Sequence, residues 1–331
     1  MEILGDLMRI TLSGRTLLYW LRTVAVHPDL NGAGCGAPVT HLAYNTCPPP
    51  SPWPHTGNSG PLPRLLSSTA AMATDGAAPA DPKKNLLTFD TEEDVAVALA
   101  KYTAELSAKF AAERGAFTVV LSGGTLIETL RKLAEPPYLG TVDWSKWHVF
   151  WVDERVVRKD HVDSNYKLAV DGLLSKVPIP TGQVYAINDA LSAEGAAADY
   201  ETVLKQLVKN GVLAMSTATG FPRFDLMLLG MGPDGHIASL FPGHPLLNEN
   251  QKWVTHIMDS PKPPPQRITF TFPVIKSSAY VAMVVTGPGE AGTVKKALSD
   301  EKTFPLLPVE MAILQDGEFT WFTDKAAVSM L

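Results

Sequence analysis

The sequence predicts an α/β protein with a mostly parallel sheet and helices on both faces. From residue 82 onward, apolar runs typical of buried strands alternate with segments whose apolar residues recur at helical spacing. Two of the strands end in glycine-rich turns, at residues 122–125 and 230–235. Because strands that alternate with helices form parallel sheets, this order favours a sheet that is covered on both sides.

The elements follow in chain order. Thr91 and Asp94 resemble a capping box, and apolar residues at helical spacing from Val95 to Phe110 predict the helix that it starts. A strand at 117–121 leads to a helix at 126–134, which two prolines end. A strand at 147–152 precedes a loop at 153–155, and a helix follows Ser164 and Asn165. The remaining predicted elements are strands at 184–187, 224–229, 267–272, 279–286 and 319–322, and helices at 193–209, from 237, at 291–298 and at 324–331.

The composition limits the partners. The chain has 331 residues, of which 45% are hydrophobic and 19% charged, and its formal net charge is −6. This suffices for a real core, and the acidic balance predicts no nucleic-acid partner. No run of about 18 uncharged apolar residues exists, so we expect no membrane span. Cys35 and Cys47 give no disulfide framework, and their spacing from His41 and His55 matches no common zinc finger.

The first 81 residues differ from the rest. Residues 1–80 contain no lysine, four acidic residues and ten prolines. Such a segment buries too little apolar surface to order itself, so we expect a disordered leader at 1–81 and a folded domain at 82–331. The leader is either a plastid transit peptide or an untargeted extension with Met72 as the true start. We expect a chloroplast or cytoplasmic protein, and Ser329-Met330-Leu331 resembles a peroxisomal address with one change.

An anion cradle is predicted where the strand at 117–121 meets a helix. Ser122, Gly123, Gly124 and Thr125 offer two hydroxyls and unobstructed N–H groups at a helix N-terminus. The turn lacks the lysine of a Walker loop and the glycine pattern of a dinucleotide site, so a single phosphate fits best. An ordinary strand-to-helix turn is the alternative.

Charged residues mark two more strand ends. Asp153, Glu154 and Arg155 abruptly end the apolar strand before them, which places them at the same edge of the sheet. Arg267 begins a strand after a run of prolines, where a fixed guanidinium can grip phosphate through two hydrogen bonds. Solvated surface charges, which contribute little to stability, are the alternative for both.

The segment 229–236 carries the strongest signal. It joins a buried strand to a helix-prone segment, and its three glycines allow backbone angles that are closed to other residues. Asp234 and His236 then lie at the carboxyl edge of the sheet, where α/β proteins bind ligands. Imidazole titrates near neutrality and a neighbouring carboxylate can orient it, so these two residues are the predicted acid–base pair.

Together these motifs resemble the 6-phosphogluconolactonases, plant members in particular. The resemblance rests on residues 122–124, 152–155, 163–166, 230–242 and 264–269, and it spans about residues 86–331 in the right order. It implies a Rossmann-like fold shared with glucosamine-6-phosphate deaminases and a catalytic domain at 82–331. It also implies hydrolysis of 6-phospho-D-glucono-1,5-lactone to 6-phospho-D-gluconate in the oxidative pentose phosphate pathway, with no metal and no organic cofactor.

The resemblance implies a role for each candidate residue. His236, steadied by Asp234, activates water, and Arg155 contacts the substrate; Asp153 is a further candidate catalytic residue. The turn from Ser122 through Gly123 and Gly124 to Thr125 holds the phosphate together with Arg267. The expected partner is the small sugar-phosphate lactone, and we expect a monomer or a weak dimer.

One position departs from the family pattern. Members usually carry lysine near the substrate phosphate where this chain has Glu290, and the reversed charge weakens phosphate binding by about one to several kcal/mol. Two other functions therefore stay open. One is deaminase or isomerase chemistry on an amino-sugar phosphate, with Asp153 as the base and His236 opening the ring. The other is a non-catalytic protein that binds sugar phosphates.

Overall fold

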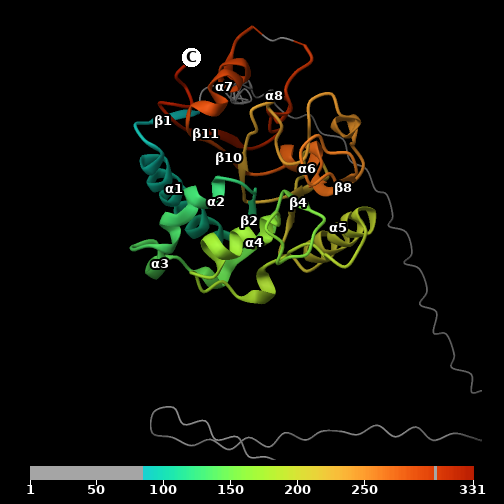
Figure 1. The fold of residues 1–331 in the computed structure, drawn as a ribbon. Coiled ribbons are helices and arrows are strands. Elements are labelled where there is room, and N and C mark those ends of the chain that lie inside the picture. Colours follow the sequence, from blue (N-terminus) through green and yellow to red (C-terminus); the bar gives the residue numbers. More distant parts are fainter. Residues whose placement is uncertain (1–84, 302–303) are drawn as a thin grey trace, which may run out of the picture. The chain divides into compact units, whose positions relative to one another are not determined.

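The computed structural model describes residues 85–301 and 304–331. The predictions for the leader, including the two cysteines and Met72, lie outside these residues. A six-stranded sheet, in which every pair of neighbours is parallel, forms the centre (Figure 1). Its order is β1 (Leu86–Phe89), β11 (Glu318–Asp324), β10 (Tyr280–Val285), β7 (Leu226–Gly230), β2 (Phe117–Leu121) and β3 (Trp147–Trp151). The predicted α/β class is confirmed.

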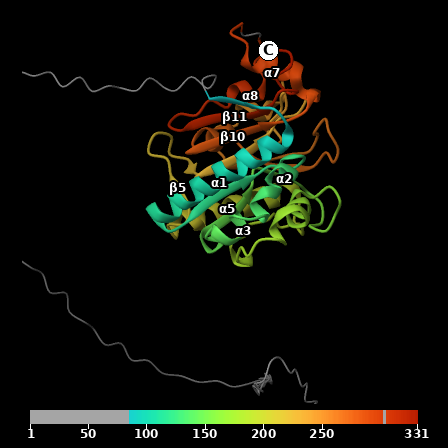
Figure 2. The same cartoon turned by 90° about the vertical axis from the view of Figure 1, so that its left-hand side faces the viewer.

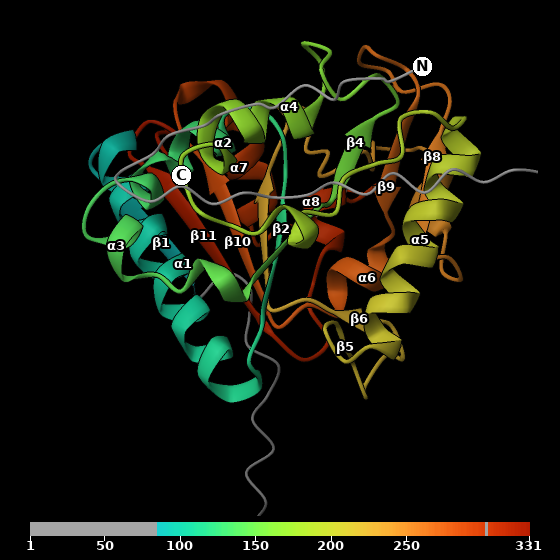
Figure 3. The same ribbon diagram turned by 90° about the horizontal axis from the view of Figure 1, so that it is seen from below.

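Both faces of the sheet are buried, because successive side chains of a strand point to opposite sides. In β2, Val120 packs into the core that contains α5 (Ala193–Lys209). Val119 and Leu121 pack into a second core that contains α1 (Glu92–Arg114). Figure 3 shows α1 and α5 on opposite sides of the sheet, and in Figure 2 the side with α1 faces the viewer. Burial on both faces explains why these strands are continuously apolar.

Shorter helices complete the layers. They are α2 (Leu126–Thr129), which continues as a 3₁₀ helix at Leu130–Ala134, α3 (Tyr138–Thr141), α4 (Asn165–Ala169), α6 (Phe272–Lys276), α7 (Ala291–Leu298) and α8 (Pro308–Met311). A second, antiparallel sheet contains β4 (Asp153–Arg155), β9 (Arg267–Phe270) and β8 (Val254–Ile257), and a third pairs β5 (Ala214–Met215) with β6 (Pro222–Arg223).

A buried ion pair ties α1 to the sheet. Arg114 lies in the last turn of α1, and its Nη2 atom is 2.6 Å from Oδ2 of Asp225, a residue that is 3% exposed. The same oxygen accepts hydrogen bonds from the backbone N–H and the hydroxyl of Thr118. The carboxylate thus joins the helix to the start of two adjacent strands, β2 and β7.

The sheet reverses its order between β2 and β7. The chain continues from β2 to β3 on one side, and from β7 to β10 and β11 on the other. The loops that follow β2 and β7 therefore diverge and leave a crevice between them. In open α/β sheets, ligands bind at such a point.

Five predicted elements differ from the structure. Residues 153–155 form strand β4 instead of a loop, because they pair with β9. Residues 184–187 make a single bridge to β3, since the Tyr185 carbonyl accepts a hydrogen bond from the Tyr200 hydroxyl. The helix predicted at 324–331 does not form: β11 continues to Asp324, whose carboxylate accepts the N–H of Ala327, and residues 325–330 form turns. The predicted strand at 267–272 ends at Phe270, where α6 soon begins.

The fifth difference concerns the helix predicted from residue 237, which does not form. Ala238 has a positive φ of 52°, and the N–H of Ser239 donates to Thr269 Oγ1 at 3.3 Å. Tertiary hydrogen bonds therefore replace the local ones that a helix requires. The segment is a buried loop that packs Ile237 and Leu240 into the core.

Candidate active site

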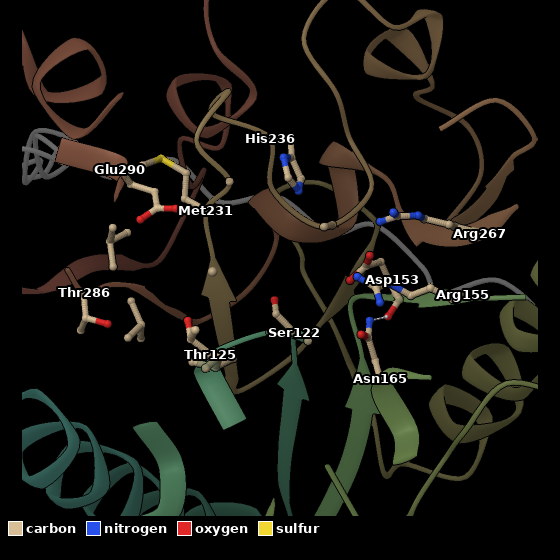
Figure 4. Close-up of a pocket in the computed structure, with 18 residues that line it drawn as sticks. Ser122, Thr125, Asp153, Arg155, Asn165, Met231, His236, Arg267, Thr286 and Glu290 are labelled. Carbon is tan, nitrogen blue, oxygen red and sulfur yellow. Dashed lines mark hydrogen bonds between the residues drawn. The ribbon is translucent and has the colours of Figure 1, made fainter. Parts of the chain in front are cut away.

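A pocket of about 240 Å³ lies between the loops that follow β2 and β7 (Figure 4). Its walls contain every predicted site residue except Asp234. Those residues are Ser122, Gly123, Gly124, Thr125, Asp153, Arg155, His236 and Arg267. Residues far apart in the sequence thus meet at the edge of the sheet that the motifs indicated.

The Asp234–His236 pair forms as predicted. Oδ1 of Asp234 lies 2.6 Å from Nδ1 of His236, and the imidazole projects into the pocket (Figure 4). The carboxylate fixes the proton on Nδ1, which leaves the Nε2 lone pair as a base. Burial lowers the pKa of His236 below its usual 6.5, although the carboxylate of Asp234 opposes this shift. The ring is therefore neutral near pH 7 and can accept a proton.

Only part of the glycine argument for this turn is confirmed. Of the three glycines, Gly235 alone has a positive φ, of 81°. Gly232 is needed for a different reason: a Cβ atom there would lie 2.1 Å from Cε1 of His236. A Cβ on Gly230 would meet no atom within 4 Å. The turn is thus shaped by one backbone angle and by one close approach of the imidazole to the main chain.

The turn after β2 presents free hydrogen-bond donors. Among the described residues, none accepts a hydrogen bond from the backbone N–H groups of Gly123, Gly124 or Thr125. The buried hydroxyl of Ser122 also lacks a partner in this part of the chain, and it faces the pocket. Asn165 lies so close to Gly123 that any side chain there would overlap its carboxamide. A buried hydroxyl without a partner, as at Ser122, is rare, and together with the free N–H groups of this turn it is suited to bind an anion.

Two arginines occupy the pocket wall beside β4 and β9. Arg155 and Arg267 are directly opposed in the antiparallel ladder. Like charges in such a position repel unless an anion lies near them. Arg155 donates from Nη1 to the Asp163 carbonyl at 2.9 Å, and its buried Nε has no partner among the described residues.

Arg267 holds a loop as well as facing the pocket. Its Nε and Nη2 atoms donate to the carbonyls of Lys262, Pro263 and Pro264 at 2.8–3.1 Å. Nη1 lies 3.4 Å from the hydroxyl of Ser239. Because four of its contacts are with other residues of the chain, the Arg267 guanidinium contributes a fixed positive charge. It is less free to form two hydrogen bonds with a phosphate group.

The charged run at 153–155 divides between two environments. Asp153 faces the pocket and accepts the Ser239 hydroxyl at 2.7 Å. Glu154 turns away and accepts the backbone N–H groups of Asn165 and Tyr166, at the start of α4. Burial raises the pKa of Glu154 to about 7. Glu154 therefore does not line the pocket. It holds the start of α4 in place through the two backbone N–H groups.

Sequence reasoning missed several site residues. Asn165 and Thr286 line the pocket, and Lys262 places its Nζ atom 3.1 Å from Oδ1 of Asp234. Lys262 lies 26 residues beyond His236, in a proline-rich stretch in which the sequence indicated only Arg267 as a site residue. Glu290 lies in the pocket wall with Thr286, on the side opposite Arg155 and Arg267 (Figure 4).

Within residues 85–301 and 304–331, no group of three or more His, Cys, Asp and Glu side chains is arranged to hold a metal ion. No helix in this part of the chain is long and apolar enough to cross a membrane.

An imidazole–carboxylate pair that faces donors without partners among the described residues, across the switch point of a parallel sheet, is typical of an α/β enzyme that acts on an anionic substrate. Residues 90–321 match the family model for glucosamine-6-phosphate isomerases and 6-phosphogluconolactonases. The chain belongs to this family.

Relatives and solved structures agree with this assignment. A protein from Oryza sativa subsp. japonica named "Probable 6-phosphogluconolactonase 4, chloroplastic" is 78% identical over 83% of this chain and 87% of its own length. The "6-phosphogluconolactonase 3, chloroplastic" of Arabidopsis thaliana is 62% identical over 76% of each chain. The crystal structure of the 6-phosphogluconolactonase from Thermotoga maritima is similar with a TM-score of 0.61 and 28% identity, over 73% of this chain and 99% of that one.

Proposed function

We propose that this chain hydrolyses 6-phospho-D-glucono-1,5-lactone to 6-phospho-D-gluconate in the oxidative pentose phosphate pathway. The proposal rests above all on the neutral imidazole of His236, which Asp234 orients toward a pocket rich in anion-binding groups. The names of the rice and Arabidopsis relatives support the substrate.

The chemistry needs one base and one stabilised oxyanion. Nε2 of His236 takes a proton from water, and the resulting hydroxide attacks the lactone carbonyl. Arg155 stabilises the negative charge that develops on the carbonyl oxygen. When the tetrahedral intermediate collapses, the ester bond breaks and the imidazolium returns its proton to the leaving ring oxygen. The enzyme ends in its starting state, and no redox step or cofactor enters.

The phosphate end of the substrate is held by the turn after β2. The N–H groups of Gly123, Gly124 and Thr125 and the hydroxyl of Ser122 supply the donors, and Arg267 adds positive charge. Anchoring this end fixes the distance between the carbonyl and His236. Such positioning contributes to the rate by making the attack effectively intramolecular.

Lactonase assays with freshly generated 6-phosphogluconolactone test the proposal, after subtraction of the spontaneous reaction. We expect hydrolysis by the wild type and no ammonia release from glucosamine-6-phosphate. Deaminase chemistry would use as its base the carboxylate of Asp153, which lines the pocket and accepts the Ser239 hydroxyl through Oδ2. Ammonia release without lactone hydrolysis would overturn the proposal.

We propose further that residues 1–81 direct the chain to the chloroplast and that residues 82–331 are the catalytic domain. The rice and Arabidopsis relatives carry the word "chloroplastic" in their names. A fluorescent reporter fused to residues 1–81 should enter plastids, and residues 82–331 alone should retain full lactonase activity. Cytosolic fluorescence, or peroxisomal targeting that depends on Ser329-Met330-Leu331, would contradict the targeting proposal.

We propose that the active unit is a monomer or a weak dimer. One chain supplies every group used in the reaction above. Specific activity should therefore not change with enzyme concentration, and sedimentation should show a mass near 35.7 kDa at low concentration.

A further inference from the structure

We propose that Lys262 is a positioning residue, whose ammonium group holds Asp234 against His236 and completes a three-member Lys–Asp–His unit. Its Nζ atom lies 3.1 Å from Oδ1 of Asp234 and 3.3 Å from Nδ1 of His236. Oδ1 therefore accepts hydrogen bonds from the ammonium and the imidazole together. This inference deepens the proposed function and rests on His236 acting as the base.

Lys262 supports the pair from outside the pocket. The pocket walls include His236 but neither Asp234 nor Lys262. The ammonium therefore acts through Asp234 rather than on the substrate. A carboxylate that is about one-third exposed has other orientations available to it, and a second donor on the same oxygen restricts them.

The backbone of Lys262 is held in place. Arg267, which is 3% exposed, donates to the carbonyls of Lys262 and of the two prolines after it. The Ser260 hydroxyl donates to the Lys262 carbonyl at 2.8 Å and accepts a hydrogen bond from the Lys262 N–H at 3.3 Å. These hydrogen bonds explain why the backbone of Lys262 has a fixed position in a proline-rich loop.

The charge of Lys262 also acts on the titration of the base. Charged groups that face His236 are Asp234 and Asp153, which favour the imidazolium, and Lys262, which disfavours it. Arg267 lies farther away, over the ring of Phe241 that contacts the imidazole. Lys262 also helps to keep the pKa of Asp234 below its usual value. The lysine thus maintains the combination that catalysis needs, an ionised carboxylate beside a neutral imidazole.

The Lys262→Met, Lys262→Arg and Lys252→Met variants test the inference. Lys252 is an exposed lysine outside the site and serves as the control for a lost charge. In Lys262→Met we expect kcat to fall about tenfold or more at pH 6 with little change in KM, and the acid limb of kcat/KM to move to higher pH by up to about one unit. Lys262→Arg should restore the wild-type limb, and Lys252→Met should match the wild type.

An NMR titration of the His236 imidazole gives a readout that does not depend on turnover. Its pKa should rise in Lys262→Met and return toward the wild-type value in Lys262→Arg. An unchanged titration and an unchanged pH profile in folded Lys262→Met would overturn the inference. A raised KM with an unmoved profile would also overturn it, because it would place Lys262 on the substrate. A wild type that does not hydrolyse the lactone would instead overturn the proposed function, while the titration would still test the Lys–Asp–His unit.

Discussion

Oδ1 of Asp234 lies 2.6 Å from Nδ1 of His236, so the carboxylate fixes which nitrogen of the imidazole carries the proton. Two residues of a single turn thereby form the proposed base and the carboxylate that orients it. The turn follows β7 at the point where the sheet order reverses, so the pair faces the donors that follow β2. The consequences of this arrangement can be measured.

The pH profile should report the buried imidazole. Burial lowers the pKa of His236 below 6.5, and the base works only when neutral. We therefore expect kcat/KM to be flat above this pKa and to fall as the pH drops through it. In Asp234→Asn the acid limb should move to lower pH, because the carboxylate favours the imidazolium, and the maximal rate should fall by about 10²–10⁴. Activity that increases below pH 6 would contradict His236 as the base.

Gly232 should be intolerant of any side chain. A Cβ atom at this position would lie 2.1 Å from Cε1 of His236, so Gly232→Ala must displace the ring. A shift of about 1 Å in a catalytic group costs on the order of 10² in rate. We expect that loss in kcat with little change in thermal unfolding. Gly182→Ala is the matched control, since a Cβ there meets no atom within 4 Å. Equal activity in the two variants would show that the close approach is unimportant.

Glu290 should weaken the binding of an anionic substrate. Its carboxylate shares a pocket with the proposed phosphate cradle. Removing the charge in Glu290→Gln should lower KM, and reversing it in Glu290→Lys should lower KM further, by roughly threefold to thirtyfold in all. The kcat value should change little, and Glu194→Lys, on the exposed face of α5, controls for net charge. An unchanged KM in both Glu290 variants would place the phosphate away from this wall.

Local patterns predicted what local interactions determine. The capping box of Thr91 and Asp94 forms, and the helices at 193–209 and 291–298 have the predicted ends. Each depends on residues close together in the chain. The site residues were recognisable for a related reason: polar groups that end buried strands collect at one edge of a parallel sheet.

Long-range contacts account for what the sequence could not reveal. Residues after His236 have helical propensity, yet Ser239 bonds instead to Asp153 and Thr269, which come from two distant strands. The same applies to Lys262, whose position depends on hydrogen bonds from Arg267 to its own backbone and that of its neighbours. Helical or strand periodicity carries no information about such contacts.

The ion pair between Arg114 and Asp225 should contribute to the stability of the fold and not to catalysis. Arg114→Met leaves the carboxylate of Asp225 buried with only Thr118 as a partner. Removing one partner of a buried pair costs about 2–4 kcal/mol. Urea unfolding should show that loss, with kcat and KM unchanged at low temperature. Arg158→Met, which breaks an exposed pair with Asp160, should have no measurable effect. Equal stabilities of the two variants would contradict this assignment.

The most direct test is the rate of lactone hydrolysis by His236→Ala, measured beside the wild type with the spontaneous reaction subtracted. We expect kcat to fall by about 10²–10⁴ while the protein stays folded and still binds 6-phosphogluconate. Undiminished hydrolysis by the folded variant would contradict the account, because no other residue has been assigned as the base that activates water.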